Sequence, residues 1–294
     1  MKKSIAFAAA LLATTAGVSA SADSDMRPAT PLSAVKAGEP MRMTYELRAT
    51  AWALFIPITG KARFTADIKD DTYSIRSKVK TTGLADILVN YDLSLSATGY
   101  TRDDRLDTYA YVSQNSDGKK NRRVELTYGK DDFTMTAKPV FGNLGDPAAT
   151  AEQALDATDP ITALITFALE PRAEGEDPCG GPLKVFDGRQ LTHLHLTNAG
   201  RKTVRSDVWR GEAIECHVRM DKVAGYKEGE SDNDNLTGID GPLRMYLAEM
   251  PNGATVPVRI EADTDDIGKV VLQASVLKFE PLLTEEASTG ARGG

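Results

Sequence analysis

The chain has 294 residues, of which 26% are charged, and its formal net charge is −7. A chain of this length can bury a large hydrophobic core. The acidic balance argues against nucleic acid and against anionic membrane surfaces as partners, because both carry negative charge. We therefore expect no nucleic-acid partner.

Residues 1–22 are predicted to be a secretory signal peptide. Two lysines precede the apolar run Ile5–Val18, and the sequence ASA at 20–22 has the small-residue form that signal peptidase cleaves. The run is shorter than the roughly 20 apolar residues that cross a bilayer as a helix, and no later stretch is comparably apolar. The sequence thus predicts a protein secreted to the periplasm without a membrane span.

Residues 41–281 are predicted to form a single β domain. The stretch MRMTYELRA at 41–49 alternates apolar and polar residues with the period of a half-buried strand. The same pattern returns about fourteen times along the chain, separated by turn residues. We expect an all-β fold with a single, strongly curved, largely antiparallel sheet, either a lipocalin-like open barrel or a β-spiral. Residues 23–40 are predicted to be a flexible lead-in and residues 282–294 a disordered tail.

One segment, DPITALITFALEP at 159–171, breaks the strand pattern. Asp159 is a good N-cap with Pro160 at the first helical position, and apolar residues recur from Ile161 at i+3, i+4, i+7 and i+8. The sequence predicts one amphipathic helix from about Pro160 to Leu169, packed against the sheet.

Cys179 and Cys216 are the two cysteines of the chain. In an oxidising compartment the expected state of such a pair is a disulfide. Closing a loop of this length constrains the unfolded chain by roughly 4 kcal/mol in the chain-entropy model. A catalytic redox pair is the competing interpretation, but such pairs normally have C-x-x-C spacing.

The stretch CGGPLKVFDGRQLTHLHLTNAG at 179–200 contains several residues that could carry chemistry. Asp187 and Gly188 form a strong hairpin signal, so Asp187 is predicted to be a turn residue. His193 and His195 project from one face of a strand, but zinc requires three or four ligands and His217 belongs to another strand. No G-x-S-x-G, P-loop, G-x-G-x-x-G or H-E-x-x-H motif occurs. We predict no catalytic residue, no metal site and no cofactor.

The stretch ATAWALFIPITG at 49–60 is more apolar than a strand with one face in water requires. It could line a cavity enclosed by the curled sheet, and plain core is the alternative. On the cavity interpretation, Trp52, Phe55 and Tyr91 are the predicted ligand-lining residues, because aromatic side chains bury a large area at a small cost in entropy.

Several stretches resemble the exported bacterial family of domain of unknown function 3108. They are YELRATAWALFIPITGKARFTADIKDDTYSIRSKVKTTG, DPITALI, CGGPLKVFDGRQLTHLHL, CHVRMDKVAGY and VPVRIEADTDDIGKVVLQASVL, and the VFDGR hairpin with the DP helix is the most specific part. The resemblance covers most of residues 41–280. It implies a periplasmic, all-β, lipocalin-like or open-barrel protein with no assigned catalytic residues. The chain is also similar in length, signal and cysteine pair to the alphaproteobacterial periplasmic β-spiral proteins linked to envelope integrity.

These observations lead to one functional hypothesis with two alternatives. The leading hypothesis is a non-enzymatic periplasmic binding or envelope-maintenance protein that holds an apolar or amphipathic ligand, such as a lipid or a peptide segment, in a curved sheet. The first alternative is a scaffold that binds an envelope protein through a sheet edge. The second is a hydrolase acting on an envelope component through His193, His195 or His217.

Overall fold

The computed structural model describes most of the predicted β domain. It describes residues 32, 34–35, 39–53, 56–82, 91–102, 105–117, 120–172, 175–227, 239–264 and 268–282. The predicted signal peptide, most of the predicted lead-in and nearly all of the predicted tail lie outside the described residues.

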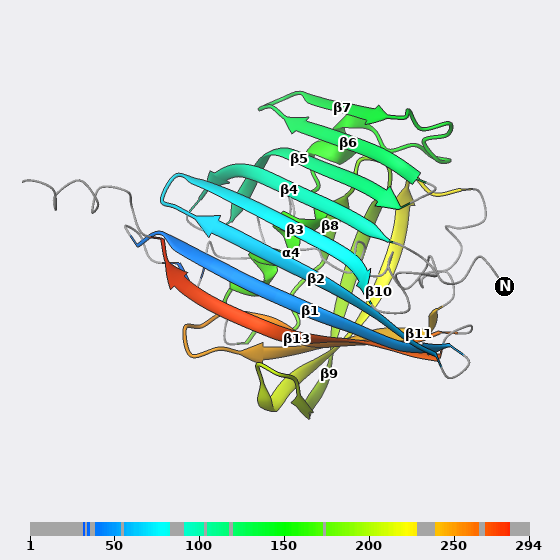
Figure 1. Cartoon of the computed structure of the whole chain (residues 1–294). Helices are drawn as coiled ribbons and strands as arrows, with labels where there is room; N and C mark the ends of the chain where they lie inside the picture. The colour runs from blue at the N-terminus through cyan, green and yellow to red at the C-terminus, as the bar shows by residue number, and fades with distance from the viewer. Residues whose placement is uncertain are drawn as a thin grey trace, which may run out of the picture.

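The strands form one antiparallel sheet, which confirms the predicted fold class. Thirteen described strands follow the order β7-β6-β5-β4-β3-β2-β1-β13-β12-β11-β10-β9-β8, and Figure 1 shows the sheet curling around one helix. The strands are β1 (Met41–Ala53), β2 (Ile56–Ile68), β3 (Thr72–Thr82), β4 (Asp92–Thr101), β5 (Leu106–Asp117), β6 (Lys120–Tyr128), β7 (Phe133–Lys138), β8 (Leu183–Phe186), β9 (Leu191–Arg205), β10 (Arg210–Ala224), β11 (Ile239–Glu249), β12 (Thr255–Thr264) and β13 (Gly268–Pro281).

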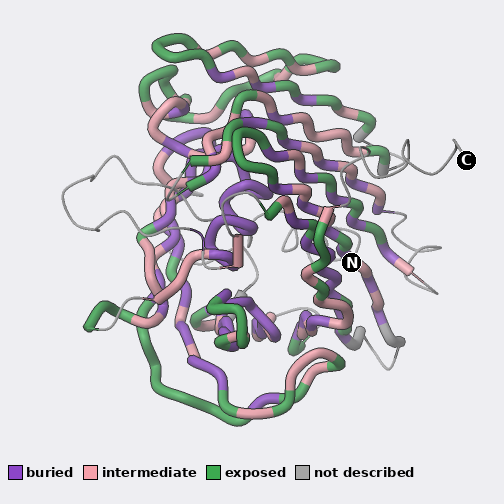
Figure 2. The backbone as a smooth tube through the Cα atoms, turned by 90° about the vertical axis from the view of Figure 1, so that its left-hand side faces the viewer, coloured by how far each residue is buried: buried purple, intermediate pink, exposed green. Residues whose placement is uncertain are grey.

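The inner face of the curved sheet carries the core. Along β3, Tyr73, Ile75 and Val79 are buried, whereas Lys78 and Lys80 between and beyond them are exposed. Successive side chains of a strand point to opposite faces, so this alternation identifies the concave face as the apolar one. Figure 2 shows the same alternation of buried and exposed residues along several strands.

Helix α4 (Pro160–Leu169) lies inside the curve of the sheet, against β12, β4, β8, β3 and β5. The predicted limits, the N-cap Asp159 and the proline at the start are all present. The structure differs from the prediction in one respect, because all ten helical residues are buried. An amphipathic helix would keep one face in water, whereas this helix is enclosed on every side.

A buried hydrogen-bond network holds the start of α4. Oδ1 of Asp159 accepts hydrogen bonds from the backbone N–H groups of Ile161 (3.1 Å) and Thr162 (3.0 Å), and its Oδ2 accepts one from Oγ1 of Thr108 (2.6 Å). The hydroxyl of Tyr73 lies 2.9 Å from Oγ1 of Thr162 and donates to Oγ1 of Thr108 at 3.1 Å. Burial raises the pKa of Asp159. The network ties the helix to β3 and β5.

A second helix, α3 (Ala151–Leu155), was not predicted from the sequence. Its N-cap is Thr150, whose side chain accepts a hydrogen bond from the backbone N–H of Gln153 while the Gln153 side chain accepts one from the backbone N–H of Thr150. Five residues are too few for an apolar periodicity to show in the sequence.

The two edges of the sheet approach each other through side chains and loops. The ring of Phe133 in β7 lies 5.8 Å from that of Phe186 in β8, and 5.3 Å from that of Tyr128 in β6. After β7, the backbone N–H of Asp146 donates to the carbonyl of Tyr226 at 2.9 Å. The architecture is therefore barrel-like although β7 and β8 do not pair as strands.

The predicted disulfide between Cys179 and Cys216 is present. It joins the segment before β8 to the middle of β10, and both cysteines are fully buried. The backbone N–H of Cys179 also donates to Oδ1 of Asp177 at 2.8 Å. The edge of the sheet at β8 is thus covalently fixed to a strand farther inside it.

The network at Asp159 predicts an unequal response to cap substitutions. Asp159→Ala removes the acceptor of two buried backbone N–H groups and of the half-buried Thr108 hydroxyl, so we expect it to lower the free energy of unfolding by about 2–4 kcal/mol. Asp159→Asn keeps a side-chain acceptor and should cost less than half as much. Urea denaturation monitored by circular dichroism measures both.

The matched control is Thr150→Ala at the exposed cap of α3. We expect it to cost about 0.5–1 kcal/mol, because water can satisfy the freed backbone donor. Equal losses for Asp159→Ala and Thr150→Ala would contradict the importance of the buried network.

Candidate functional site

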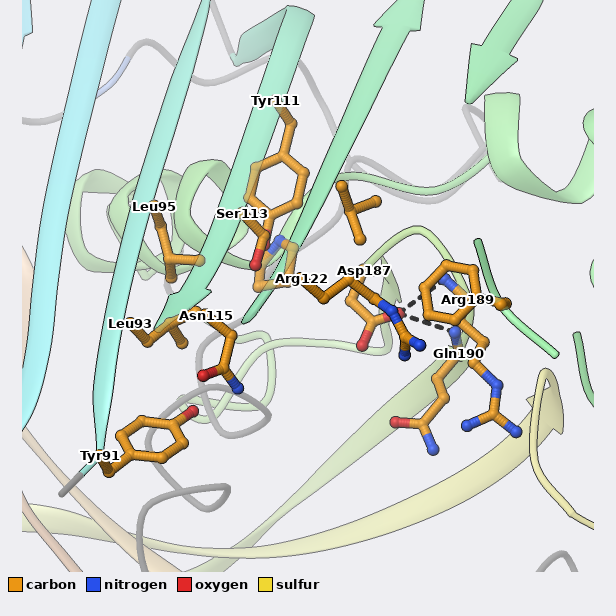
Figure 3. A pocket seen from close by; sticks show the side chains of 13 residues that line it. Tyr91, Leu93, Leu95, Tyr111, Ser113, Asn115, Arg122, Asp187, Arg189 and Gln190 are labelled. Atoms are coloured by element: carbon orange, nitrogen blue, oxygen red, sulfur yellow. Dashed lines mark hydrogen bonds between the residues drawn. The ribbon is translucent and has the colours of Figure 1, made fainter. Parts of the chain in front are cut away.

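A cleft of about 330 Å³ opens on the inner face of β4, β5 and β6, beside the N-terminus of α4. The turn that joins β8 to β9 forms its opposite wall, and Pro160 contributes the helix end. Figure 3 shows these walls with the lining side chains. The volume is at the lower end of the range of about 300–1,000 Å³ that is usual for ligand pockets.

Strand register explains how the wall of the cleft is graded in polarity. Residues that face each other across the three strands form rows, and the rows become more polar toward one end of the cleft. From the apolar to the polar end, the rows are Ala97–Tyr111–Leu126, then Leu95–Ser113–Val124, then Leu93–Asn115–Arg122.

The opposite wall is the turn at residues 187–190, where Asp187 takes the structural role predicted for it. Its Oδ1 accepts hydrogen bonds from the backbone N–H groups of Arg189 (2.8 Å) and Gln190 (2.7 Å), which Figure 3 marks with dashed lines. Burial raises the pKa of Asp187. Gly188 has φ +99° and lies so close to Val124 that a Cβ there would be 2.5 Å from Cγ1 of that valine. The turn therefore packs directly on β6.

Two arginines line the cleft from opposite walls. Nε of Arg122 donates to the carbonyl of Pro139 at 3.1 Å, and the Arg122 guanidinium lies over the ring of Phe141 at 4.5 Å. Nε of Arg189 is buried and has no hydrogen-bond partner within the described part of the chain. Burying a donor without a partner costs free energy, so this group is a candidate to donate to a polar ligand in the cleft.

Of the three predicted ligand-lining residues, the structure describes the side chain of one. Tyr91 is buried and lines the cleft; its contact with a ligand stays a prediction. Only the backbone of Trp52 is described, in β1 opposite residue 57. Phe55 lies outside the described residues.

Sequence reasoning missed Arg122 and Arg189 as lining residues. A signal for Arg122 was present, because it has the same phase as the buried Val124, Leu126 and Tyr128 of β6. A charged residue in the inward phase of a strand suggests a cavity or a partner. No comparable local signal exists for Arg189, which faces the cleft because a distant turn folds over β6.

A second cleft of about 840 Å³ lies by the β4–β5 connection and the segment after α3. Its arginines are already paired: Asp107 accepts hydrogen bonds from Nε of Arg102 (2.9 Å) and from Nε of Arg105 (2.7 Å). Arg102 also lies over the ring of Tyr100, which is 46% exposed. Because both arginines are held by a carboxylate and the aromatic rim is open to solvent, this cleft is the weaker candidate.

The histidines lie outside both clefts. His195 Nε2 is 2.7 Å from Oδ2 of Asp221, and His217 Nε2 is 3.5 Å from Oε1 of Glu215. The pKa of His193 is lowered, first by burial. Over the residues that the structure describes, no group of three or more His, Cys, Asp or Glu side chains could hold a metal.

Comparison with known proteins gives one family match and a set of distant structural likenesses. The model of the family described as protein of unknown function (DUF3108) matches residues 42–275. A search of the curated proteins finds no match. Among the described residues, no helix has the length and apolar character needed to cross a membrane.

Three of the structural likenesses are to crystal structures of the following proteins. A β-barrel-like DUF1849 protein from Brucella abortus is 12% identical with a TM-score of 0.44, over 85% of this chain and 100% of that one. A DUF1329 protein from Desulfovibrio piger is 11% identical with a TM-score of 0.31, over 83% and 87%. A domain described as an outer membrane lipoprotein-sorting protein from Vibrio parahaemolyticus is 7% identical with a TM-score of 0.26, over 83% and 87%. These values are too low to bear on function.

The packing of the 187–190 turn predicts a large effect of Gly225→Ala. Gly225 has φ +83°, and a Cβ there would lie 1.8 Å from the carbonyl oxygen of Arg189. We expect the substitution to displace the turn and to lower the free energy of unfolding by at least about 3 kcal/mol, because backbone strain and a backbone clash add. Urea denaturation gives the stability, and hydrogen exchange of residues 187–190 reports on the turn.

Gly175→Ala is the matched control for this substitution. Gly175 has a similar φ of +88°, but its Cβ would meet nothing within 4 Å. It should cost only the backbone strain of about 1–2 kcal/mol. Similar losses for the two variants, or unchanged exchange in the turn of Gly225→Ala, would contradict this account of the cleft wall.

Proposed function

We propose a function for this chain, which belongs to the DUF3108 family: it is a periplasmic, non-enzymatic binding protein of the cell envelope. It holds an apolar or amphipathic ligand, a lipid or a peptide segment, in the cleft between β4–β6 and the 187–190 turn. The predicted signal peptide supports the compartment.

The observation that carries the proposal is the graded inner wall of the cleft. In most of the core the concave face is apolar, but here Ser113, Asn115 and Arg122 occupy inward positions of β5 and β6 beside buried leucines. Binding sites for small molecules combine an apolar lining with a few polar groups that fix orientation. A plain core would fill these positions with apolar side chains.

The scaffold alternative is supported by a different feature. β7 (Phe133–Lys138) is at one edge of the sheet and pairs with β6 on one side. An edge strand can add a strand from a partner through backbone hydrogen bonds. This alternative needs no ligand in the cleft, so blocking the cleft separates the two hypotheses.

Blocking the cleft should abolish ligand binding. Ser113→Trp places a large ring between Leu95 and Val124 on the inner wall, so we expect it to weaken binding of the neutral apolar dye N-phenyl-1-naphthylamine at least about tenfold. Fluorescence titration measures the affinity. Native mass spectrometry of protein purified from its own periplasm should show a bound small molecule in the wild type and none in Ser113→Trp.

The matched control is Val112→Trp, which places the same ring on the outer face of the same strand. It should leave dye binding unchanged. Absence of dye binding in the wild type, or equal binding by Ser113→Trp and the wild type, would refute the binding function and favour the scaffold.

A further inference from the structure

The two arginines of the cleft lie on opposite walls. Arg122 belongs to the polar row with Asn115 and Leu93. The turn that carries Arg189 packs on Val124 and Leu126 of β6 through the close approach of Gly188. Figure 3 shows Arg122 and Arg189 with Asp187 and Gln190 on the side of the cleft away from Leu93 and Leu95.

The charges of the cleft favour an anion. Arg122 and Arg189 contribute two positive charges, and Asp187 contributes the one carboxylate of the lining. Oδ1 of that carboxylate is already engaged by two backbone N–H groups of its own turn. The Arg189 side chain, in contrast, has a buried Nε without a hydrogen-bond partner among the described residues.

The contacts of Arg122 hold its guanidinium in a position to bind an anion. Its Nε is held by the carbonyl of Pro139, and its planar face rests on the ring of Phe141. These two contacts fix the plane of the guanidinium without using a carboxylate. A guanidinium fixed in this way suits the bidentate binding of a carboxylate or a phosphate, since less side-chain freedom is lost when the anion binds.

We propose that the ligand of this cleft is a single-chain amphiphile with an anionic head group, a carboxylate or a phosphate, bound by Arg122 and Arg189. The apolar chain lies toward Leu95, Tyr111 and Val124. The inference rests on the proposed binding function and adds the chemical class of the ligand and two specificity-determining residues. The small volume of the cleft favours one hydrocarbon chain over two.

Four ligands that share a chain and differ in head group test the proposal. Decanoate, decyl phosphate, decanol and decylamine are each titrated against bound N-phenyl-1-naphthylamine at pH 7. Decanol is kept below its solubility limit and the other three below their critical micelle concentrations. We expect one or both anions to bind at least about tenfold more tightly than decanol. The reason is that an anionic head group forms charge-assisted hydrogen bonds with the arginines, whereas a neutral alcohol does not. The preference between decanoate and decyl phosphate distinguishes the two head groups.

Variants assign the effect to the two arginines. Arg122→Gln and Arg189→Gln should each weaken binding of the preferred anion about tenfold or more and leave decanol affinity unchanged, which also shows that the variants fold. Arg123→Gln is the control. Arg123 follows Arg122 in β6 but lies on the outer face of the sheet, where it pairs with Glu125. It should change neither the affinity for the preferred anion nor the affinity for decanol.

The possible failures are distinct. Equal affinities for decanol and the anions would overturn the anionic head group and leave the binding function standing. Tighter binding of decylamine would overturn it as well, and would assign the head-group contact to Asp187. If the dye binds but none of the four ligands displaces it, the inference fails and the binding function stands. If the dye itself does not bind, both fail together.

Discussion

Enclosing a helix that is buried on every side is the constraint on which this architecture depends. A sheet can bury such a helix only by curving around it, and α4 lies inside the curve of a sheet of thirteen described strands. The first residues of the helix are then buried, so their free N–H groups need acceptors from the protein. Asp159 supplies the acceptors, and Thr108 and Tyr73 connect that carboxylate to the sheet.

The helix also determines where the cleft can exist. α4 fills the inside of the curve along its own length, and the cleft begins at Pro160, where the helix starts. Past the start of the helix, the inner face is covered by the 187–190 turn. Within this turn, the backbone N–H groups of Arg189 and Gln190 donate to the side chain of Asp187. The core is thus built by strands and a helix, whereas the candidate site is completed by a turn.

The sequence predicts the local features of this fold and misses those that depend on distant pairing. Alternation in the strands, the cap at Asp159 and the cysteine pair are each visible within a short window or in a count, and the structure contains them. Helix α3 is too short to show a period. The presence of Arg122 and Arg189 in one cleft depends on strand register and on how the turn folds over β6, and neither is readable from residues so far apart.

The first and last strands are neighbours in the middle of the sheet. β1 and β13 pair from Met41 with Pro281 onward, with six strands beyond β1 and five beyond β13. During synthesis β1–β7 can pair as successive hairpins, but one edge of β1 has no partner until the final 14 residues of the sheet arrive. The pairing of β1 with β13 joins residues that are very far apart in the sequence, and such contacts slow folding. Until β13 pairs, the open edge of β1 can pair with other chains. A folding factor that shields this edge would therefore act in the interval between the formation of β1 and the arrival of β13.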